Sequence, residues 1–131
     1  MKQPAPIDTT PFAASLQLRR QSVLADIQQK LHGSDDPSKL AFFNHLEAVG
    51  DWIEADLFND IDIAILEKEL GELRDLDTAL LRIQAGTYGI CTDCSESISP
   101  HRLHALPTAH RCVICQRNFE KHHGTERHAL L

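Results

Sequence analysis

The first hydrophobic pattern along the chain repeats every three or four residues, as on one face of a helix. Its members are Leu16, Val23, Leu24, Ile27 and Leu31. Thr10-Pro11 suits the start of this helix, because threonine can cap it and proline fits its first turn. We therefore predict a helix from residue 11 to about His32, preceded by a flexible tail over residues 1–10.

The pattern stops at Gly33 and resumes after Asp36-Pro37, where a second helix can start. The apolar face of this second helix consists of Leu40, Phe43 and Leu46. Gly50-Asp51-Trp52 then predicts a turn before the next run of apolar positions.

Residues 54–85 carry the longest run of apolar positions at helical spacing. These are Leu57, Ile61, Leu66, Leu70, Leu73, Leu76, Leu80 and Ile83. A helix of about thirty residues is about 45 Å long, and Gly86 can end it in a left-handed conformation. Because its single apolar face must be buried, we expect the upstream helices to pack against it. The prediction is a mostly α fold with a long antiparallel, coiled-coil-like helical hairpin over residues 11–85 and its tip near residues 49–54.

Four cysteines follow in a turn-rich segment. Cys91-x-x-Cys94 and Cys112-x-x-Cys115 are separated by 17 residues. Each pair can supply two thiolates from one turn, and the loop is long enough to bring both pairs to one tetrahedral Zn²⁺. Such an ion contributes about 10–16 kcal/mol of apparent binding free energy, which stabilises a module too small for a large core. We predict one structural zinc in a module over residues 86–123, with a short C-terminal helix from near Cys112 to Gly124 and a frayed tail over residues 124–131.

Two other interpretations of the cysteines are a pair of unrelated surface motifs and a thioredoxin-like redox motif. The matching spacing of the two pairs favours zinc over both. A catalytic zinc would need a free coordination position, which four thiolates do not leave. Histidines inside the finger loop could compete as ligands, and these are His101, His104 and His110. We interpret the histidines near the C-terminus as solvated residues that form a weak adventitious metal site at most, and these are His122, His123 and His128.

Composition and charge narrow the classes of function. Hydrophobic residues make up 42% of the chain and aromatic residues 5%, which favours helices over a sheet sandwich. The first residues lack an apolar signal region, no stretch is apolar enough to span a membrane, and all cysteines are paired by spacing. We therefore expect a cytoplasmic protein with no membrane contact.

The net charge of −6 is concentrated between Glu47 and Asp77, where the only bases are Lys68 and Arg74. Such a surface repels a phosphate backbone, so we expect no direct DNA binding and a basic groove on a protein as the partner. Most acids of the long helix are interpreted as solvating its exposed surface, and these are Asp60, Asp62, Glu67, Glu69, Glu72, Asp75 and Asp77.

The segment from Gly86 to Cys94, Gly-Thr-Tyr-Gly-Ile-Cys-Thr-Asp-Cys, closely resembles the DksA/TraR zinc-finger family. So do the downstream positions Ile98, Arg102-Leu103, Ala105, Pro107-Thr108-Ala109 and Cys112-x-x-Cys115. The resemblance implies a bacterial transcription factor that binds RNA polymerase, without enzyme activity of its own. In that family a helical hairpin enters the polymerase secondary channel and carries an acidic tip toward the catalytic centre, which changes promoter-complex stability. We expect such a factor to act as a monomer, with one Zn²⁺ as its cofactor.

The family's best-known tip pattern is Asp-x-x-Asp-x-Ala, which this chain matches only in part. Aligned without gaps, the second Asp of the pattern falls on Asp51, while its other two positions are not matched. We interpret Asp51 as the main tip residue and Glu54 and Asp56 as further acids at comparable spacing. Trp52 is interpreted as an apolar contact at the same tip.

Family members that bind the alarmone ppGpp use two basic residues where this chain has Leu106 and Gln116. Each charge-assisted hydrogen bond to such a ligand contributes about 1.5–3 kcal/mol, so we expect little dependence on ppGpp. Two alternative functions stay open. One is a transcript-cleavage factor similar to the Gre factors, in which Asp51 and Glu54 hold magnesium. The other is a zinc-ribbon adaptor or nucleic-acid binder.

Overall fold

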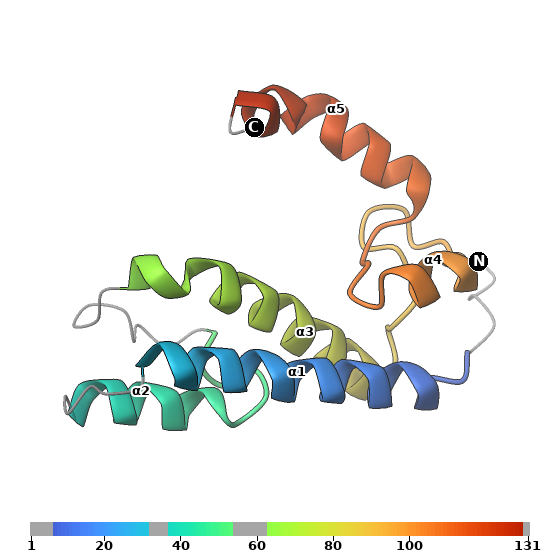
Figure 1. The fold of residues 1–131 in the computed structure, drawn as a ribbon. Helices are drawn as coiled ribbons and strands as arrows, with labels where there is room; N and C mark the ends of the chain where they lie inside the picture. The colour runs from blue at the N-terminus through green and yellow to red at the C-terminus, as the bar shows by residue number, and fades with distance from the viewer. Residues whose placement is uncertain (1–6, 32–36, 54–62, 130–131) are drawn as a thin grey trace.

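The computed structural model describes residues 7–31, 37–53 and 63–129 of the chain. Its helices are α1 (Thr10–Leu31), α2 (Pro37–Leu46), the 3-10 turn η1 (Ile63–Leu66), α3 (Glu67–Ala85), α4 (Pro100–Ala105) and α5 (Val113–Ala129). Within these ranges the only β pairing is an isolated antiparallel bridge between Ile90 and Ser97. The prediction of a mostly helical chain is therefore confirmed (Figure 1).

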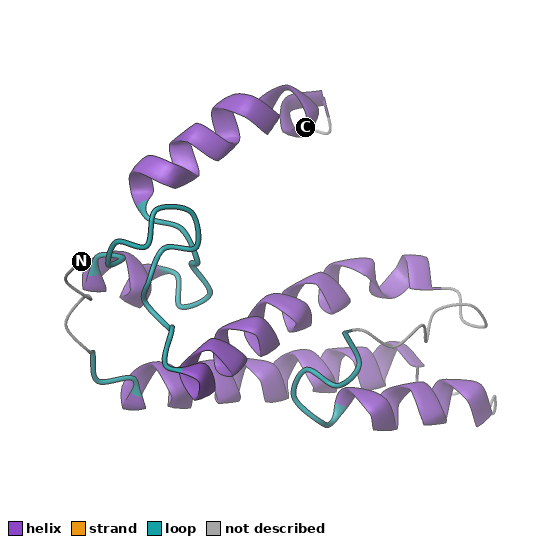
Figure 2. Cartoon of the chain, turned by 180° about the vertical axis from the view of Figure 1, so that it is seen from behind, coloured by secondary structure: helices purple, strands orange, loops and turns teal. Residues whose placement is uncertain are grey.

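The body of the molecule is an elongated prong formed by α1, α2 and α3. Helices α1 and α3 run antiparallel along most of its length, and α2 turns back beside α1 (Figures 1 and 2). The apolar residues at helical spacing meet in the core of the prong, which includes Leu16, Val23, Ile27, Leu70, Leu73, Leu76 and Leu80. Burying these side chains is the main source of stability of the prong.

Two ion pairs connect α1 to α3 on the surface of the prong. Arg19 donates two hydrogen bonds to the Glu72 carboxylate, at 2.5 and 2.8 Å. Lys30 bonds to Glu69 and also donates to the Ile65 carbonyl oxygen at 3.0 Å. Lys30 is in the last turn of α1 and Glu69 is in the first turn of α3, so the end of α1 lies beside the start of α3.

A third ion pair between α1 and α3 is buried inside the prong. Arg20 is 4% exposed and Asp77 is 0% exposed, and Arg20 Nε donates to Asp77 Oδ1 at 2.6 Å. The interpretation of Asp77 as a solvated surface acid is therefore wrong. Asp77 lies beside Leu73, Leu76 and Leu80 on the buried face of α3, where its charge is balanced by Arg20.

The turn after α2 lies in a different place from the one that the sequence suggested. Trp52 is fully buried, and its indole Nε1 donates to Asp77 Oδ2 at 2.7 Å. Because Asp77 is near the middle of α3, the turn packs on the flank of the prong instead of forming its end. The expectation that Trp52 is an apolar contact at a tip does not fit this position, because the indole ring is buried in the core and its one donor is bonded to Asp77.

The helix expected over residues 54–85 is observed as α3, preceded by η1, while residues 54–62 lie outside the described residues. Its predicted C-terminal glycine is confirmed. Gly86 has φ 78° and ends α3 in the left-handed conformation. The next amide, that of Thr87, bonds to the Arg82 carbonyl oxygen at 2.9 Å, which satisfies one of the last free carbonyls of the helix.

Helix α5 continues through Gly124 to Ala129, so it is longer than predicted. A glycine inside a helix costs about 1 kcal/mol relative to alanine, which is not enough to end the helix here. In Figure 1, α5 projects from the cysteine-rich module as a separate arm above the prong. No helix in the described ranges combines the length and the apolar character that crossing a bilayer requires.

Candidate zinc centre

The cysteine-rich module, residues 86–121, is built onto the end of the prong where α1 begins and α3 ends. Tyr88 is buried there against Phe12, with ring centroids 5.5 Å apart. The Tyr88 hydroxyl donates to the Pro107 carbonyl oxygen at 2.8 Å, which ties the second half of the module to the first. Arg82 of α3 donates to the carbonyl oxygens of Thr87 and Ile90. The module and the prong therefore share one continuous core.

The first cysteine pair lies in a turn that the Ile90–Ser97 bridge closes. The Cys91 amide donates to the Glu96 carbonyl oxygen at 2.8 Å, and the Ser95 amide donates back to the Cys91 carbonyl oxygen at 3.0 Å. The second pair, Cys112 and Cys115, spans the start of α5. Two intervening residues place both sulfurs of each pair on the same side of its turn, as a tetrahedral metal requires.

The four sulfur atoms form one cluster. Their Sγ atoms all lie within 4.8 Å of one another, and Cys94 Sγ is 3.8 Å from Cys112 Sγ. In a tetrahedron of Zn–S bonds of about 2.3 Å, neighbouring sulfurs are about 3.8 Å apart. The cluster therefore has the size and the ligand set of a closed Zn²⁺ site, and the predicted structural zinc is confirmed.

Backbone amides support the charge of this cluster. The Asp93 amide lies 3.4 Å from Cys91 Sγ, and the Cys115 amide lies 3.4 Å from Cys112 Sγ. Burial alone would raise the pKa of the Cys91 thiol, but N–H donors of Cys112, Cys94 and Asp93 lower that pKa to about 6. The thiol of Cys112 raises the pKa of Cys115, because neighbouring sulfurs cannot all become anionic without a cation between them.

Contacts outside the sulfur cluster hold the two cysteine turns together. The Thr92 amide and hydroxyl donate to the His110 carbonyl oxygen at 2.9 and 3.1 Å. Arg111 Nε donates to Asp93 Oδ2 at 3.0 Å, and the Arg111 guanidinium carbon lies 4.0 Å from the centroid of the Phe119 ring in α5. Arg111 therefore connects the first cysteine turn to α5.

The histidines of the finger loop are not ligands of this cluster. Among the described residues, the metal-ligand group contains cysteines only. The His104 ring packs on Phe12, with centroids 4.7 Å apart, and His110 contacts Arg111. His101 is exposed.

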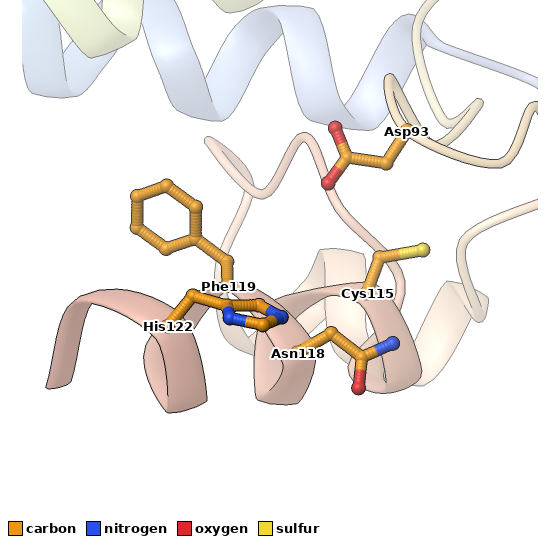
Figure 3. Close-up of a pocket in the computed structure, with 5 residues that line it drawn as sticks. All are labelled: Asp93, Cys115, Asn118, Phe119 and His122. Carbon is orange, nitrogen blue, oxygen red and sulfur yellow. The ribbon is translucent and has the colours of Figure 1, made fainter.

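An open hollow of about 330 Å³ lies beside the cysteine cluster (Figure 3). Its lining consists of Asp93, Cys115, Asn118, Phe119 and His122. His122 therefore lies near the site without belonging to the ligand group. The side chains of His123 and His128 lie outside those that the structure describes.

Of the predicted tip residues, the structure describes Asp51 and Trp52, and both lie outside the cysteine cluster. Asp51 is exposed in the turn between Gly50 and Trp52, on the flank of the prong. Glu54 and Asp56 lie outside the described residues. The Arg20–Asp77 pair was missed by sequence reasoning, although both charges fall at the helical spacing of buried apolar residues.

Comparison with known proteins also identifies a zinc finger in this part of the chain. Residues 86–121 match the prokaryotic dksA/traR C4-type zinc finger. An uncharacterized protein of Aquifex aeolicus is 44% identical over 57 residues, which are 44% of this chain and 39% of that protein. The RNA polymerase-binding transcription factor DksA of Caulobacter vibrioides is 27% identical over 84 residues, which are 64% of this chain and 58% of that protein. The matches thus span about two fifths to three fifths of these relatives.

The likeness extends to the helical body. The structure of transcription factor DksA2 from Pseudomonas aeruginosa superimposes with a TM-score of 0.58 and 28% sequence identity. The superposition covers 87% of this chain and 84% of that chain. The arrangement of prong and finger is therefore shared with a solved transcription factor.

Proposed function

We propose that this chain, which carries a DksA/TraR C4-type zinc finger on a DksA-like helical body, is a non-enzymatic transcription factor that binds bacterial RNA polymerase. The observation that carries the proposal is the joint likeness of prong and finger to DksA2 over 87% of the chain. The relative from Caulobacter vibrioides, which bears the name of an RNA polymerase-binding factor, supports the same partner. Such a factor acts in the cytoplasm as a monomer.

The shape of the molecule supports insertion of the prong into a pore of the polymerase, its secondary channel. Helix α1 has 22 residues and is about 33 Å long. The shared core around Phe12 and Tyr88 keeps the prong in line with the zinc module. Acids on the prong, among them the exposed Glu67 and Asp75, give it a negative field that a channel lined with lysine and arginine would attract.

We propose that acids next to the turn after α2 act on promoter complexes. Asp51 is exposed, but its neighbours Gly50 and Trp52 are bonded to Asp77, which holds Asp51 beside the middle of α3. Glu54 and Asp56 follow next in the sequence, after this bonded turn. We propose these two acids as the acidic tip, with Asp51 as the comparison residue.

The first prediction separates these acids. The double variant Glu54→Gln/Asp56→Asn should still bind core RNA polymerase in a pull-down, because most of the contact surface is unchanged. Its effect on promoter-complex lifetime should fall about tenfold, since the charges near the catalytic centre are removed. Asp51→Asn, which also neutralises a carboxylate, should keep most of the effect. The opposite result would assign the activity to Asp51.

An RNA-cleavage assay tests a second function. If the chain were a transcript-cleavage factor similar to Gre, wild-type protein with Mg²⁺ would accelerate RNA cleavage in backtracked polymerase complexes. We expect no such acceleration. Failure of the wild-type protein to bind core polymerase at all would contradict the proposed function.

The second prediction concerns ppGpp. Leu106 is 48% exposed, and the Gln116 side-chain amide donates to Glu120 at 3.1 Å, so these positions offer no cation to a tetra-anionic ligand. We expect saturating ppGpp to change the affinity of the chain for polymerase less than threefold. A titration in which ppGpp tightens binding tenfold would overturn this prediction, and the double variant Leu106→Lys/Gln116→Lys should gain ppGpp dependence.

A further inference from the structure

One buried carboxylate, that of Asp77 in α3, contacts two other segments of the prong. Asp77 Oδ1 accepts from Arg20 Nε at 2.6 Å. Asp77 Oδ2 accepts from the Gly50 amide at 3.1 Å and from Trp52 Nε1 at 2.7 Å. Asp77 Oδ2 also accepts from Arg20 Nη2 at 3.3 Å. The carboxylate therefore binds α1 through both oxygens and the turn over residues 47–53 through Oδ2.

The partner of Asp77 extends this network to the end of α2. The Arg20 guanidinium donates to the Leu46 carbonyl oxygen and, at 3.2 Å, to the Glu47 carbonyl oxygen. These are carbonyls at a helix C-terminus, which have no partner within the helix. Arg20 and Asp77 together therefore fix where α2 ends and where the following turn lies.

The turn is also closely seated on α3. Gly50 has φ 81°, and a Cβ atom at this position would lie 2.7 Å from Leu81 Cδ1. Apolar residues alone could hold α1 against α3, because replacing a buried ion pair by hydrophobic residues is often neutral or stabilising. They could not fix the Gly50 amide and the Trp52 indole at one point of the helix. The ion pair therefore serves the position of the turn more than the stability of the core.

We infer that Asp77 is a positioning residue for the activity proposed above. It holds the turn over residues 47–53 on the flank of the prong and so fixes the position of Ile53, the residue that precedes Glu54 in the sequence. This inference rests on the proposed function, because the position of the acids matters only if they act on a partner.

The test uses the full chain with zinc bound. Trp52→Phe removes the indole donor and keeps an aromatic ring in place. Asp77→Asn removes the carboxylate charge that the Gly50 amide and the Trp52 indole both contact. In Asp77→Asn we expect hydrogen exchange of the Gly50 amide to rise at least tenfold more than exchange of the amides around Val23 and Ile27, which report the stability of the whole prong. Trp52→Phe should raise hydrogen exchange of the Gly50 amide by less. In Asp77→Asn, the indole N–H signal of Trp52, the single tryptophan of the chain, should shift toward that of a solvated indole.

The functional measurement must separate position from stability. Both variants should bind core polymerase within about twofold of wild type. The effect on promoter-complex lifetime should fall about tenfold in Asp77→Asn and by less in Trp52→Phe. A merely structural role would instead weaken binding and effect together. Glu72→Gln is the matched control, because it breaks the exposed Arg19–Glu72 pair between the same two helices without touching the turn.

Each outcome decides one point. If Asp77→Asn unfolds the prong, Trp52→Phe still tests the inference, because it leaves the Arg20–Asp77 pair intact. A released turn with a full effect on promoter complexes overturns the inference, and so does unchanged exchange at Gly50. A wild-type protein that binds no polymerase overturns the proposed function instead.

Discussion

Replacing Cys91 by serine should abolish stable zinc binding and unfold residues 86–121, while α1 and α3 stay helical. Cys91 is the most buried of the four ligands, at 1% exposure, and its sulfur accepts the Asp93 amide. Serine is a poor ligand for Zn²⁺ in a thiolate site, so the affinity for zinc should fall more than about a hundredfold. The module has too few apolar residues to stay folded without the ion.

Zinc per protein chain, measured by atomic emission, and hydrogen exchange along the chain test this prediction. Amides at Ile98 and Leu103 should lose their protection, whereas those at Ile27 and Leu73 should keep most of theirs. His101→Ala is the control, because His101 is exposed and outside the ligand group, and it should retain a full equivalent of zinc. Full zinc occupancy in Cys91→Ser would mean that the ligand set differs from the four cysteines.

Arg20→Ala should destabilise the prong by about 3–5 kcal/mol, because it leaves the Asp77 carboxylate buried without a counter-ion. The two carbonyl oxygens at the end of α2 also lose their donor. For a chain of this size the midpoint of thermal unfolding should fall by about 10–20 °C.

Thermal unfolding followed by circular dichroism at 222 nm, with zinc present, measures the change. Arg19→Ala is the control, since Arg19 is the next residue in α1 but its side chain is 53% exposed and pairs with Glu72 at the surface. Exposed pairs contribute little, so the midpoint should move only slightly. Equal losses in the two variants would contradict a special role for the buried pair.

The zinc centre could be predicted from the sequence almost completely. Two Cys-x-x-Cys pairs at this spacing require that each turn present two sulfurs, and the geometry of Zn²⁺ then fixes how the pairs meet. The surrounding contacts could not be predicted. Asp93–Arg111 and Arg111–Phe119 depend on the direction in which α5 leaves the site, which the spacing of the ligands does not specify.

The helices could also be predicted, but the path between them could not. The apolar spacing in α1 and α3 identifies both buried faces. Arg20 and Asp77 lie on those faces, yet one charge on an apolar face is weak evidence, because long side chains often reach solvent from such positions. Only the two opposite charges considered together would have indicated a buried pair, and with it a place for Trp52 away from any tip.

The position of the cysteines along the chain has a mechanical consequence. Cys91 and Cys94 lie in the first turns after α3, which ends at Ala85, whereas Cys112 and Cys115 lie at the start of α5. A Zn²⁺ ion held by all four cysteines would therefore tie the start of α5 to the segment that follows α3, alongside the Thr92–His110 and Asp93–Arg111 contacts. Binding of α5 to a large partner would then also change the orientation of the prong, because the zinc module joins the two.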